Sequence, residues 1–366
     1  MFSRRMVRKF NRIYKEACQP TKQIPFDPQG CRLVIFSDHH KGDGSAADDF
    51  KKNARLYEKA LDYYQSQGYR LLVVGDNEEL WENSYDQILP HYKDLIQKEI
   101  DLALENPFNK KKIRIWGNHD KEVSLSRFKR YCRKRQIKVL EPVDHREGLC
   151  LGPDIFIIHG HQGRFFDDKA WRISRWAVHF IWKTIQRLFH IGIDGPAENV
   201  QIREDLELQY YNWAKKMKIM LICGHTHRAM FASLTHYDRL RIEIQYLENS
   251  NSSSLADQKN IRKEIERKKR EMKRILQRRQ GLWPKSLSLY PQLPIPCYFN
   301  DGCCGYTNGI TCLEIDKGLI RLIKWERSGF HRRLLLENSL QLLLNYIKAK
   351  RPIDELLEPK LKRLPP

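Results

Sequence analysis

The chain has 366 residues, of which 41% are hydrophobic, a composition typical of a globular protein with a sizeable core. Its formal net charge of +21 exceeds what solubility requires, which indicates an anionic partner: a phosphorylated substrate, a nucleic acid or an acidic membrane surface. No apolar stretch approaches the roughly 20 residues of a membrane-spanning helix, and no secretory signal is visible. The nine cysteines lack C-x-x-C spacing, which argues against a disulfide framework. We therefore expect a cytoplasmic protein, with a peripheral membrane position as the alternative.

Residues 1–28 are expected to form a basic amphipathic N-terminal segment. Phe2, Met6, Phe10 and Ile13 recur at helical spacing, with Arg and Lys between them. Such a helix either lies on a membrane surface or docks on the rest of the protein, and the pattern leaves both interpretations open.

From residue 33 to residue 120 the chain alternates between apolar runs and helical stretches. The apolar runs predict strands at 33–37, 71–74 and 113–116, with helices at 46–67 and 86–105 between them. This βαβαβ order predicts parallel strands with right-handed crossovers, and hence an α/β fold. The next expected elements are a helix at 121–135, a short strand near 138–140 and a strand at 155–158.

The main domain is expected to span residues 29–330, with insertions at about 162–219 and 248–290. The first insertion carries aromatic and basic side chains at helical spacing. These predict a lid, a lipid-facing surface or a helix packed on the core, followed by a returning helix at about 203–216.

Beyond the first insertion, strands are expected at 220–223, 229–234 and 240–247. Residues 257–280 predict a helix, and residues 259–280 hold eleven Lys/Arg against three Glu. Such a run is usually a solvated helix or an arm of a helical hairpin; binding to nucleic acid or acidic lipid is the alternative. Strands and turns at 290–327 precede a C-terminal unit at 331–366, which consists of a helix at about 332–349 and a tail.

Five of the expected strands end in polar residues that can bind metals. Strand ends in α/β sheets open into the ligand crevice. Period-two spacing lets the members of Asp-x-His and His-x-His point to one side. Two divalent ions about 3.5–4 Å apart bind oxygen and imidazole ligands, so these side chains predict a dinuclear metal centre. The candidate ligands are Asp38, His40, Asp76, Asn118, His159, His225 and His227.

The order of these motifs resembles the calcineurin-like metallophosphoesterase superfamily. The matching motifs are Asp38-His39-His40, Gly75-Asp76-Asn77-Glu78-Glu79, Gly117-Asn118-His119-Asp120, His159-Gly160-His161 and Gly224-His225-Thr226-His227, with Tyr298–Gly302 as a later turn. The resemblance implies an α/β fold of the four-layer αββα sandwich type with helical insertions.

The resemblance also implies how the ligands divide between the two metals. Asp38, His40 and His227 would bind one ion, Asn118, His159 and His225 the other, and Asp76 would bridge them. The implied ions are manganese, with iron, zinc or magnesium as alternatives. A metal-bridging hydroxide would attack a phosphomonoester, a phosphodiester or a pyrophosphate. His119, oriented by Asp120, would stabilise or protonate the leaving oxygen.

Several neighbouring residues have two interpretations each. Arg164 and Arg228, next to histidine motifs, could bind phosphate through their forked donors or form surface ion pairs. His161 could face substrate or pack inside. His39 is expected to be structural, because it points away from its two neighbours. Glu79 is expected to steady the turn after Asp76.

The G-D-x-x-E-x-W motif at 75–81 and the insertion after His161 resemble the branch of bacterial UDP-2,3-diacylglucosamine pyrophosphatases. That branch typically has arginine in place of His119, and this chain is longer through 236–295. Three functions stay open at this point. They are hydrolysis of a small phosphorylated metabolite or phosphoprotein, a peripheral-membrane nucleotide-sugar-lipid pyrophosphatase, and a nucleic-acid-processing phosphoesterase that uses residues 257–280 as an electrostatic arm. The sequence does not indicate an oligomeric state.

Overall fold

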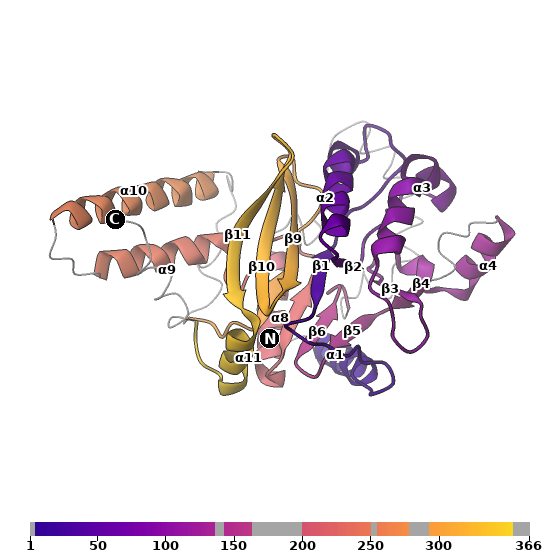
Figure 1. Cartoon of the computed structure of the whole chain (residues 1–366), viewed down its shortest axis with the longest axis horizontal. Helices are drawn as coiled ribbons and strands as arrows, with labels where there is room; N and C mark the ends of the chain where they lie inside the picture. Colours follow the sequence, from indigo (N-terminus) through magenta and orange to yellow (C-terminus); the bar gives the residue numbers. More distant parts are fainter. Residues whose placement is uncertain (1–3, 136–142, 163–199, 250–254, 278–292, 354–366) are drawn as a thin grey trace.

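The computed structural model describes residues 4–135, 143–162, 200–249, 255–277 and 293–353 (Figure 1). Helices and strands alternate through the first half, as expected for an α/β fold. In chain order the elements are α1 (Arg4–Ala17), β1 (Arg32–Phe36), η1 (Lys51–Asn53), α2 (Ala54–Ser66), β2 (Arg70–Val73), α3 (Tyr85–Leu102), β3 (Lys112–Ile115), η2 (Lys121–Ser124), α4 (Ser126–Lys134), β4 (Val143–Arg146), β5 (Gly148–Leu151), β6 (Ile155–Ile158), α8 (Val200–Met217), β7 (Met220–Cys223), α9 (His236–Asn249), α10 (Leu255–Gln277), β8 (Tyr298–Asn300), β9 (Gly309–Asp316), β10 (Leu319–Glu326), β11 (His331–Ser339) and α11 (Leu340–Ala349).

Two sheets form the centre of the molecule. The first has the strand order β11-β10-β9-β1-β2, and the second has the order β5-β6-β7-β8. β1 pairs with β2 in parallel, and β6, β7 and β8 are also parallel neighbours. β3 and β4 form a separate parallel pair, which a bridge between Val74 and Ile115 connects to the end of β2.

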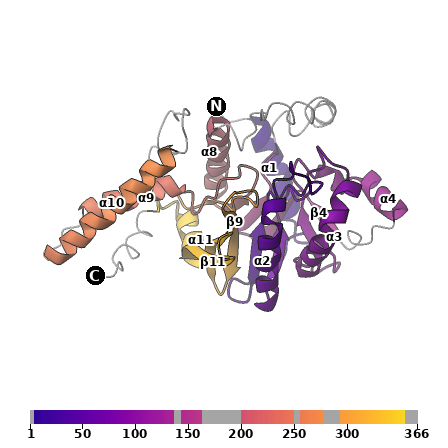
Figure 2. The same cartoon turned by 90° about the horizontal axis from the view of Figure 1, so that it is seen from above.

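Side chains alternate between the two faces of β1, and this alternation shows how the layers are stacked. Leu33 and Ile35 belong to a core shared with the second sheet and with α1 and α8, whereas Val34 and Phe36 belong to a core shared with α2 and α3. Seen from above, α8 and α1 lie on one side of the sheets and α2 on the other (Figure 2). The layers therefore follow the order helix, sheet, sheet, helix, which is the αββα sandwich expected from the sequence.

α1 docks on the second sheet. Its apolar stripe, Met6, Phe10 and Ile13, is buried, and the Phe10 ring lies 5.7 Å from the ring of Tyr210 and 5.3 Å from that of Trp213. Of the two interpretations of this basic helix, the structure shows the docked one, because the apolar side that a membrane would need is covered by the protein.

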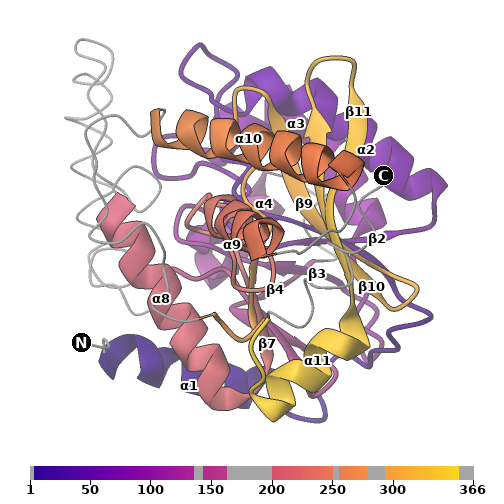
Figure 3. The same ribbon diagram turned by 90° about the vertical axis from the view of Figure 1, so that its left-hand side faces the viewer.

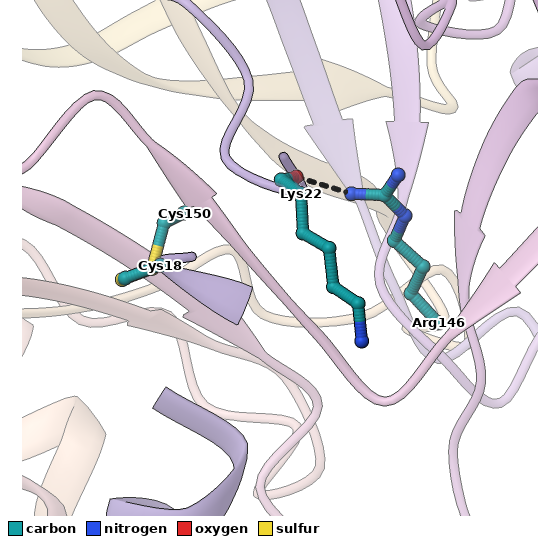
Figure 4. Close-up of a disulfide and its surroundings, with 4 residues drawn as sticks. All are labelled: Cys18, Lys22, Arg146 and Cys150. Atoms are coloured by element: carbon teal, nitrogen blue, oxygen red, sulfur yellow. Dashed lines mark hydrogen bonds between the residues drawn. A yellow bond between two sulfur atoms is a disulfide. The ribbon is translucent and has the colours of Figure 1, made fainter. Parts of the chain in front are cut away.

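A disulfide between Cys18 and Cys150 joins the end of α1 to β5 (Figure 4). Nearby, the Arg146 side chain donates a hydrogen bond to the backbone carbonyl of Lys22 at 2.8 Å. The cysteine spacing argued against a disulfide framework, and it did not predict this single disulfide. Motif spacing detects only cysteines that are close in sequence, whereas these two are 132 residues apart and meet because α1 docks.

Two further expectations about elements were wrong. Residues 240–247 form part of helix α9, not a strand. Short apolar runs fit both the helical and the strand period, and here packing against α10 favours the helix. Residues 331–339 form the strand β11, so the C-terminal helix begins only at Leu340. β11 is an edge strand with partly exposed side chains on both faces, which weakens the alternation by which strands are recognised.

Smaller differences concern three segments. The expected helix at 121–135 is divided into η2 and α4. Residues 229–234 form only isolated bridges. The strand expected at 138–140 and most of the first insertion, 163–199, lie outside the described residues. In the described part of the chain, no helix is long and apolar enough to cross a membrane.

Candidate metal centre

The predicted ligands come from the carboxyl ends of five strands. Asp38 and His40 follow β1, Asp76 follows β2, Asn118 follows β3, His159 follows β6, and His225 and His227 follow β7. Asp38, Asp76, Asn118, His159 and His225 are all at most 4% exposed. A buried set of carboxylate, imidazole and amide groups is costly unless the groups bind one another or a cation.

The backbone at these corners is in a rarely populated conformation. Five of the seven candidate ligands have a left-handed φ, which costs a non-glycine residue about 1–2 kcal/mol. The φ angles are 53° for Asp38, 53° for His40, 51° for Asp76, 68° for His225 and 52° for His227. Such conformations gather at functional sites because the surrounding structure must hold them in place.

Two glycines allow the strand ends to approach each other closely. Gly75 has φ +83°, and a Cβ there would meet the His159 ring and lie 2.9 Å from the Cα of Gly117. A Cβ on Gly117 would in turn overlap the Asp76 carboxylate. A side chain at either position would therefore push the candidate ligands apart.

Asp38, His40 and His227 form one cluster. His227 Nε2 lies 3.0 Å from Asp38 Oδ1 and 3.2 Å from His40 Nε2, and His40 Nε2 lies 4.0 Å from Asp38 Oδ1. Ligand atoms about 2.1 Å from a shared ion lie roughly 3.0–3.5 Å from one another at tetrahedral or octahedral angles, which two of these three distances match.

Asp76, His159 and His225 form a second cluster, whose potential ligand atoms all lie within 4.8 Å of one another. His159 Nε2 lies 3.1 Å from Asp76 Oδ2, and its Nδ1 lies 2.9 Å from the backbone carbonyl of Val74, the kind of contact that orients a ligating imidazole. Asp76 Oδ2 is also 3.9 Å from His40 Nε2, so this carboxylate lies between the two clusters. Burial alone would raise the pKa of Asp76, but His159 and His119 hold it well below its usual value.

Asn118 offers a further buried oxygen that could bind a metal. Its Oδ1 atom is buried and accepts no hydrogen bond within the described part of the chain. An amide oxygen left in this state costs about 1–3 kcal/mol unless another group binds it. The donor set therefore fits two divalent ions.

His119 is held by Glu79 and Trp81. Its Nδ1 lies 2.7 Å from a Glu79 carboxylate oxygen, and its ring stacks on Trp81 at 4.1 Å between centroids with an interplanar angle of 19°. Glu79 also contacts His40 Nδ1 at 2.8 Å, and Trp81 Nε1 donates to the backbone carbonyl of Asn118 at 2.8 Å. The residues of the G-D-x-x-E-x-W motif thus position two imidazoles, a role that the sequence analysis missed.

Asp120, which was expected to orient His119, accepts hydrogen bonds from two backbone N–H groups. Its Oδ1 accepts from the backbone N–H of Gly117 at 2.6 Å, and its Oδ2 accepts from that of Asn77 at 2.9 Å. Burial, together with Asp76 and Glu78, raises the pKa of Asp120 to about 6. Asp120 therefore ties the loop after β2 to the loop after β3, and the side chain that orients the His119 ring is Glu79.

The loop that carries His225 and His227 is fixed by two residues distant in sequence. Asn300 Nδ2 donates to the Gly224 carbonyl at 2.7 Å. Glu207 of α8 accepts from Thr226 Oγ1 at 2.9 Å. The turn containing Asn300 was visible in the sequence. Glu207 gave no such signal, because it is one acidic residue among several in an amphipathic helix.

The three residues proposed to contact substrate have different surroundings. Arg228 forms an ion pair with the buried Glu207 and lies 3.7 Å from Glu204, so the ion pair that it forms is largely buried and not a surface pair. His161 is fully buried, with its ring 5.3 Å from that of Trp116, and burial lowers its pKa well below the usual value. Arg164 lies outside the described residues.

His39 points away from both clusters. Its ring lies 4.6 Å from that of Tyr57 and 5.6 Å from that of Phe50, and the residue is fully buried. Burial, followed by Lys41 and Arg114, lowers the pKa of His39 well below its usual value. These contacts fit the structural role expected from the sequence.

A buried charged network holds the loop that carries Asp76. Lys41 Nζ lies 2.6 Å from Glu99 Oε1 and 2.5 Å from Asn77 Oδ1, and Arg114 NH2 lies 2.7 Å from Glu78 Oε2. All five residues are at most 2% exposed. Because each charge has a partner, the network fixes this loop at a modest net cost.

An αββα sandwich whose strand ends gather these two clusters defines a metal-dependent hydrolase. The family model described as calcineurin-like phosphoesterase matches residues 31–229, more than half of the chain. The chain therefore belongs to the calcineurin-like phosphoesterase family, whose members are dinuclear-metal-dependent hydrolases of phosphoester bonds. No curated protein matches the chain.

Proposed function

We propose that the protein hydrolyses a phosphoester with two divalent ions held at the strand ends. Asp38, His40 and His227 would bind one ion, and Asn118, His159 and His225 the other, with Asp76 bridging. When bound, such a pair of ions polarises the phosphoryl oxygens and provides a nucleophile at neutral pH.

The position of Asp76 between the two clusters is the main support for this proposal. Its carboxylate lies between an imidazole of each cluster, at 3.1 Å from His159 Nε2 and 3.9 Å from His40 Nε2. A single structural ion would need only one cluster, whereas a carboxylate shared by two clusters supports a pair of ions.

His119 would act on the leaving group. The residue is partly exposed beside the first cluster, with its side chain 23% accessible, and it stays in place through Glu79 and Trp81. An imidazole held in this way can hydrogen-bond the leaving oxygen and transfer a proton to it.

Manganese is the metal that we propose. The clusters contain no thiolate, and their carboxylate and amide oxygens suit manganese, whereas their imidazoles also suit iron and zinc. Iron, zinc and magnesium are the other outcomes of a metal analysis.

The described residues favour no lipid substrate. The membrane alternative relied on α1 and on residues 168–190. The apolar side of α1 is buried, and residues 168–190 lie outside the described residues.

The deciding experiment compares turnover of bis-p-nitrophenyl phosphate and p-nitrophenyl phosphate before and after chelation, then after adding back manganese. We expect hydrolysis that chelation abolishes and manganese restores, and the preferred ester distinguishes a diesterase from a monoesterase. Metal analysis of the purified protein should find two ions per chain. Hydrolysis that survives complete removal of metal would overturn the proposal.

A further inference from the structure

Helices α9 and α10 form a hairpin that extends to the side of the sheets beyond β11 (Figure 1). Seen from that side, the two helices are the elements nearest the viewer (Figure 3). The hairpin contributes none of the candidate ligands. Its function is therefore a separate question from that of the metal centre.

One face of α10 is occupied by α9. Ile261, Ile265 and Met272, which recur along this face, are partly buried. Lys268 is buried on the same face and pairs with Glu243 of α9 at 2.7 Å. The apolar stripe of this basic helix is thus used within the hairpin.

The opposite face of α10 carries positive charge. Arg267 and Lys269 are exposed beside this face and pair with Glu264 and Glu248. At about 100° per residue, the other five exposed basic residues of α10 fall within an arc of about 100°. They are Lys259, Arg262, Lys263, Arg270 and Lys273, which we call the outer face of α10. The one acidic residue in this arc between 259 and 273 is Glu266, which lies 3.9 Å from Arg270. The other four basic residues form no ion pair within the part of the chain that the structure describes.

The side chains of the outer face favour one kind of partner, a duplex nucleic acid. Insertion of a helix into a membrane surface requires an apolar face, and α9 covers that of α10. Binding of single-stranded nucleic acid usually requires aromatic side chains that stack on bases, and the outer face contains none. A row of cations about 21 Å long, on a rigid helix, suits the regularly spaced phosphates of a duplex.

We propose that the outer face of α10 binds the phosphodiester backbone of a duplex nucleic acid, independently of base sequence. Contacts of this kind position a protein on a duplex without reading its sequence. The binding of a duplex does not depend on the metal centre. That a duplex is also the substrate of the hydrolase rests on the proposed function.

The test measures binding of the full-length protein to a fluorescent duplex of about 20 base pairs, over a range of salt concentrations. The variant combines Lys259→Gln, Arg262→Gln, Lys263→Gln and Lys273→Gln, because glutamine retains helix propensity. The matched control removes four exposed lysines from other elements: Lys51→Gln, Lys93→Gln, Lys111→Gln and Lys216→Gln. Circular dichroism verifies that both variants are folded.

We expect the wild type and the control to bind the duplex, and the outer-face variant to bind at least about 10-fold more weakly at 0.1 M salt. The slope of log K against log salt concentration should become shallower by roughly 3 to 4, about 0.9 for each lost phosphate contact. Equal affinity of the variant and the control would overturn the proposal. So would absence of duplex binding by the wild type, or its binding to phosphatidylserine vesicles in preference to the duplex.

Two measurements separate this proposal from the proposed function. Chelation should leave duplex binding by the wild type unchanged. The outer-face variant should still hydrolyse bis-p-nitrophenyl phosphate at the wild-type rate. A protein that binds duplex but hydrolyses no ester would contradict only the proposed hydrolase.

Discussion

At the scale of single residues, the candidate centre combines buried ligands with neighbours that fix their orientation. Asp76 lies between the two clusters, and Glu79 contacts both His40 and His119. Changes at these positions should therefore separate loss of metal from loss of chemistry.

Replacing Asp76 with asparagine should abolish turnover and lower the bound metal. The change removes the negative charge between the clusters, so the two ions would lose the carboxylate that bridges them. Steady-state kinetics and metal analysis by mass spectrometry provide the measurement. Asp94→Asn, at an exposed position on α3, is the matched control. Full activity of the Asp76 variant would rule out its bridging role.

His119→Ala should slow turnover by about 10²-fold or more, because a positioned proton donor is lost. The metal content should stay at the wild-type value, since neither proposed ligand set includes this residue. Loss of metal together with activity would instead identify His119 as a ligand.

Trp81→Ala should reduce kcat by about 2- to 12-fold, which corresponds to the 0.5–1.5 kcal/mol of a ring stack. The KM should change little, because Trp81 stacks on His119; any loss of bound metal would instead report its hydrogen bond to the backbone carbonyl of Asn118. Trp81→Phe retains an aromatic ring and should recover part of the rate. The positioning role would be excluded if both variants had wild-type kcat.

At the scale of elements, the docking of α1 decides how the second sheet is covered. Phe10 is fully buried between the rings of Tyr210 and Trp213, so α1 and α8 form one helical layer. α8 in turn contributes Glu207, which holds the loop of His225 and His227. The N-terminal helix thus supports the metal centre from a distance.

Phe10→Ala should destabilise the protein by about 3–5 kcal/mol, the usual cost of removing a buried aromatic side chain. Denaturant unfolding monitored by tryptophan fluorescence gives the free energy of unfolding. Lys15→Ala, at an exposed position on the same helix, should change it by less than about 0.5 kcal/mol. A small effect of Phe10→Ala would mean that α1 is not docked in solution.

The sequence predicted the strands at the centre well, because each is a short apolar run followed by a polar cluster. β1, β2, β3, β6 and β7 all appear where such runs occur. It failed for α9, where a run such as Leu240–Leu247 fits both periods, and for β11, whose side chains are exposed at a sheet edge. The pairing of Glu79 with His119 joins loops 40 residues apart, which spacing alone cannot predict.

At the scale of the whole molecule, the Cys18–Cys150 disulfide adds a long-range covalent link to a chain otherwise held by packing. Such a link stabilises a protein mainly by restricting its unfolded state, and the effect grows with the length of the closed loop. With a sequence separation of 132 between the two cysteines, the loop is long.

The double variant Cys18→Ser, Cys150→Ala should lose up to about 5 kcal/mol of unfolding free energy relative to the oxidised protein. Adding reductant to the wild type should have a similar effect, whereas reductant should leave the double variant unchanged. If wild type and variant unfold identically under oxidising conditions, the two cysteines are not linked in solution.

The same disulfide divides the candidate ligands into two groups. Residues 18–150 form a covalent ring that contains Asp38, His40, Asp76 and Asn118, while His159, His225 and His227 belong to the open chain beyond it. Each proposed ion takes ligands from both groups, so bound metal would fasten the ring to the open segment. The oxidised metal-bound protein would then be closed twice, once by sulfur and once by metal.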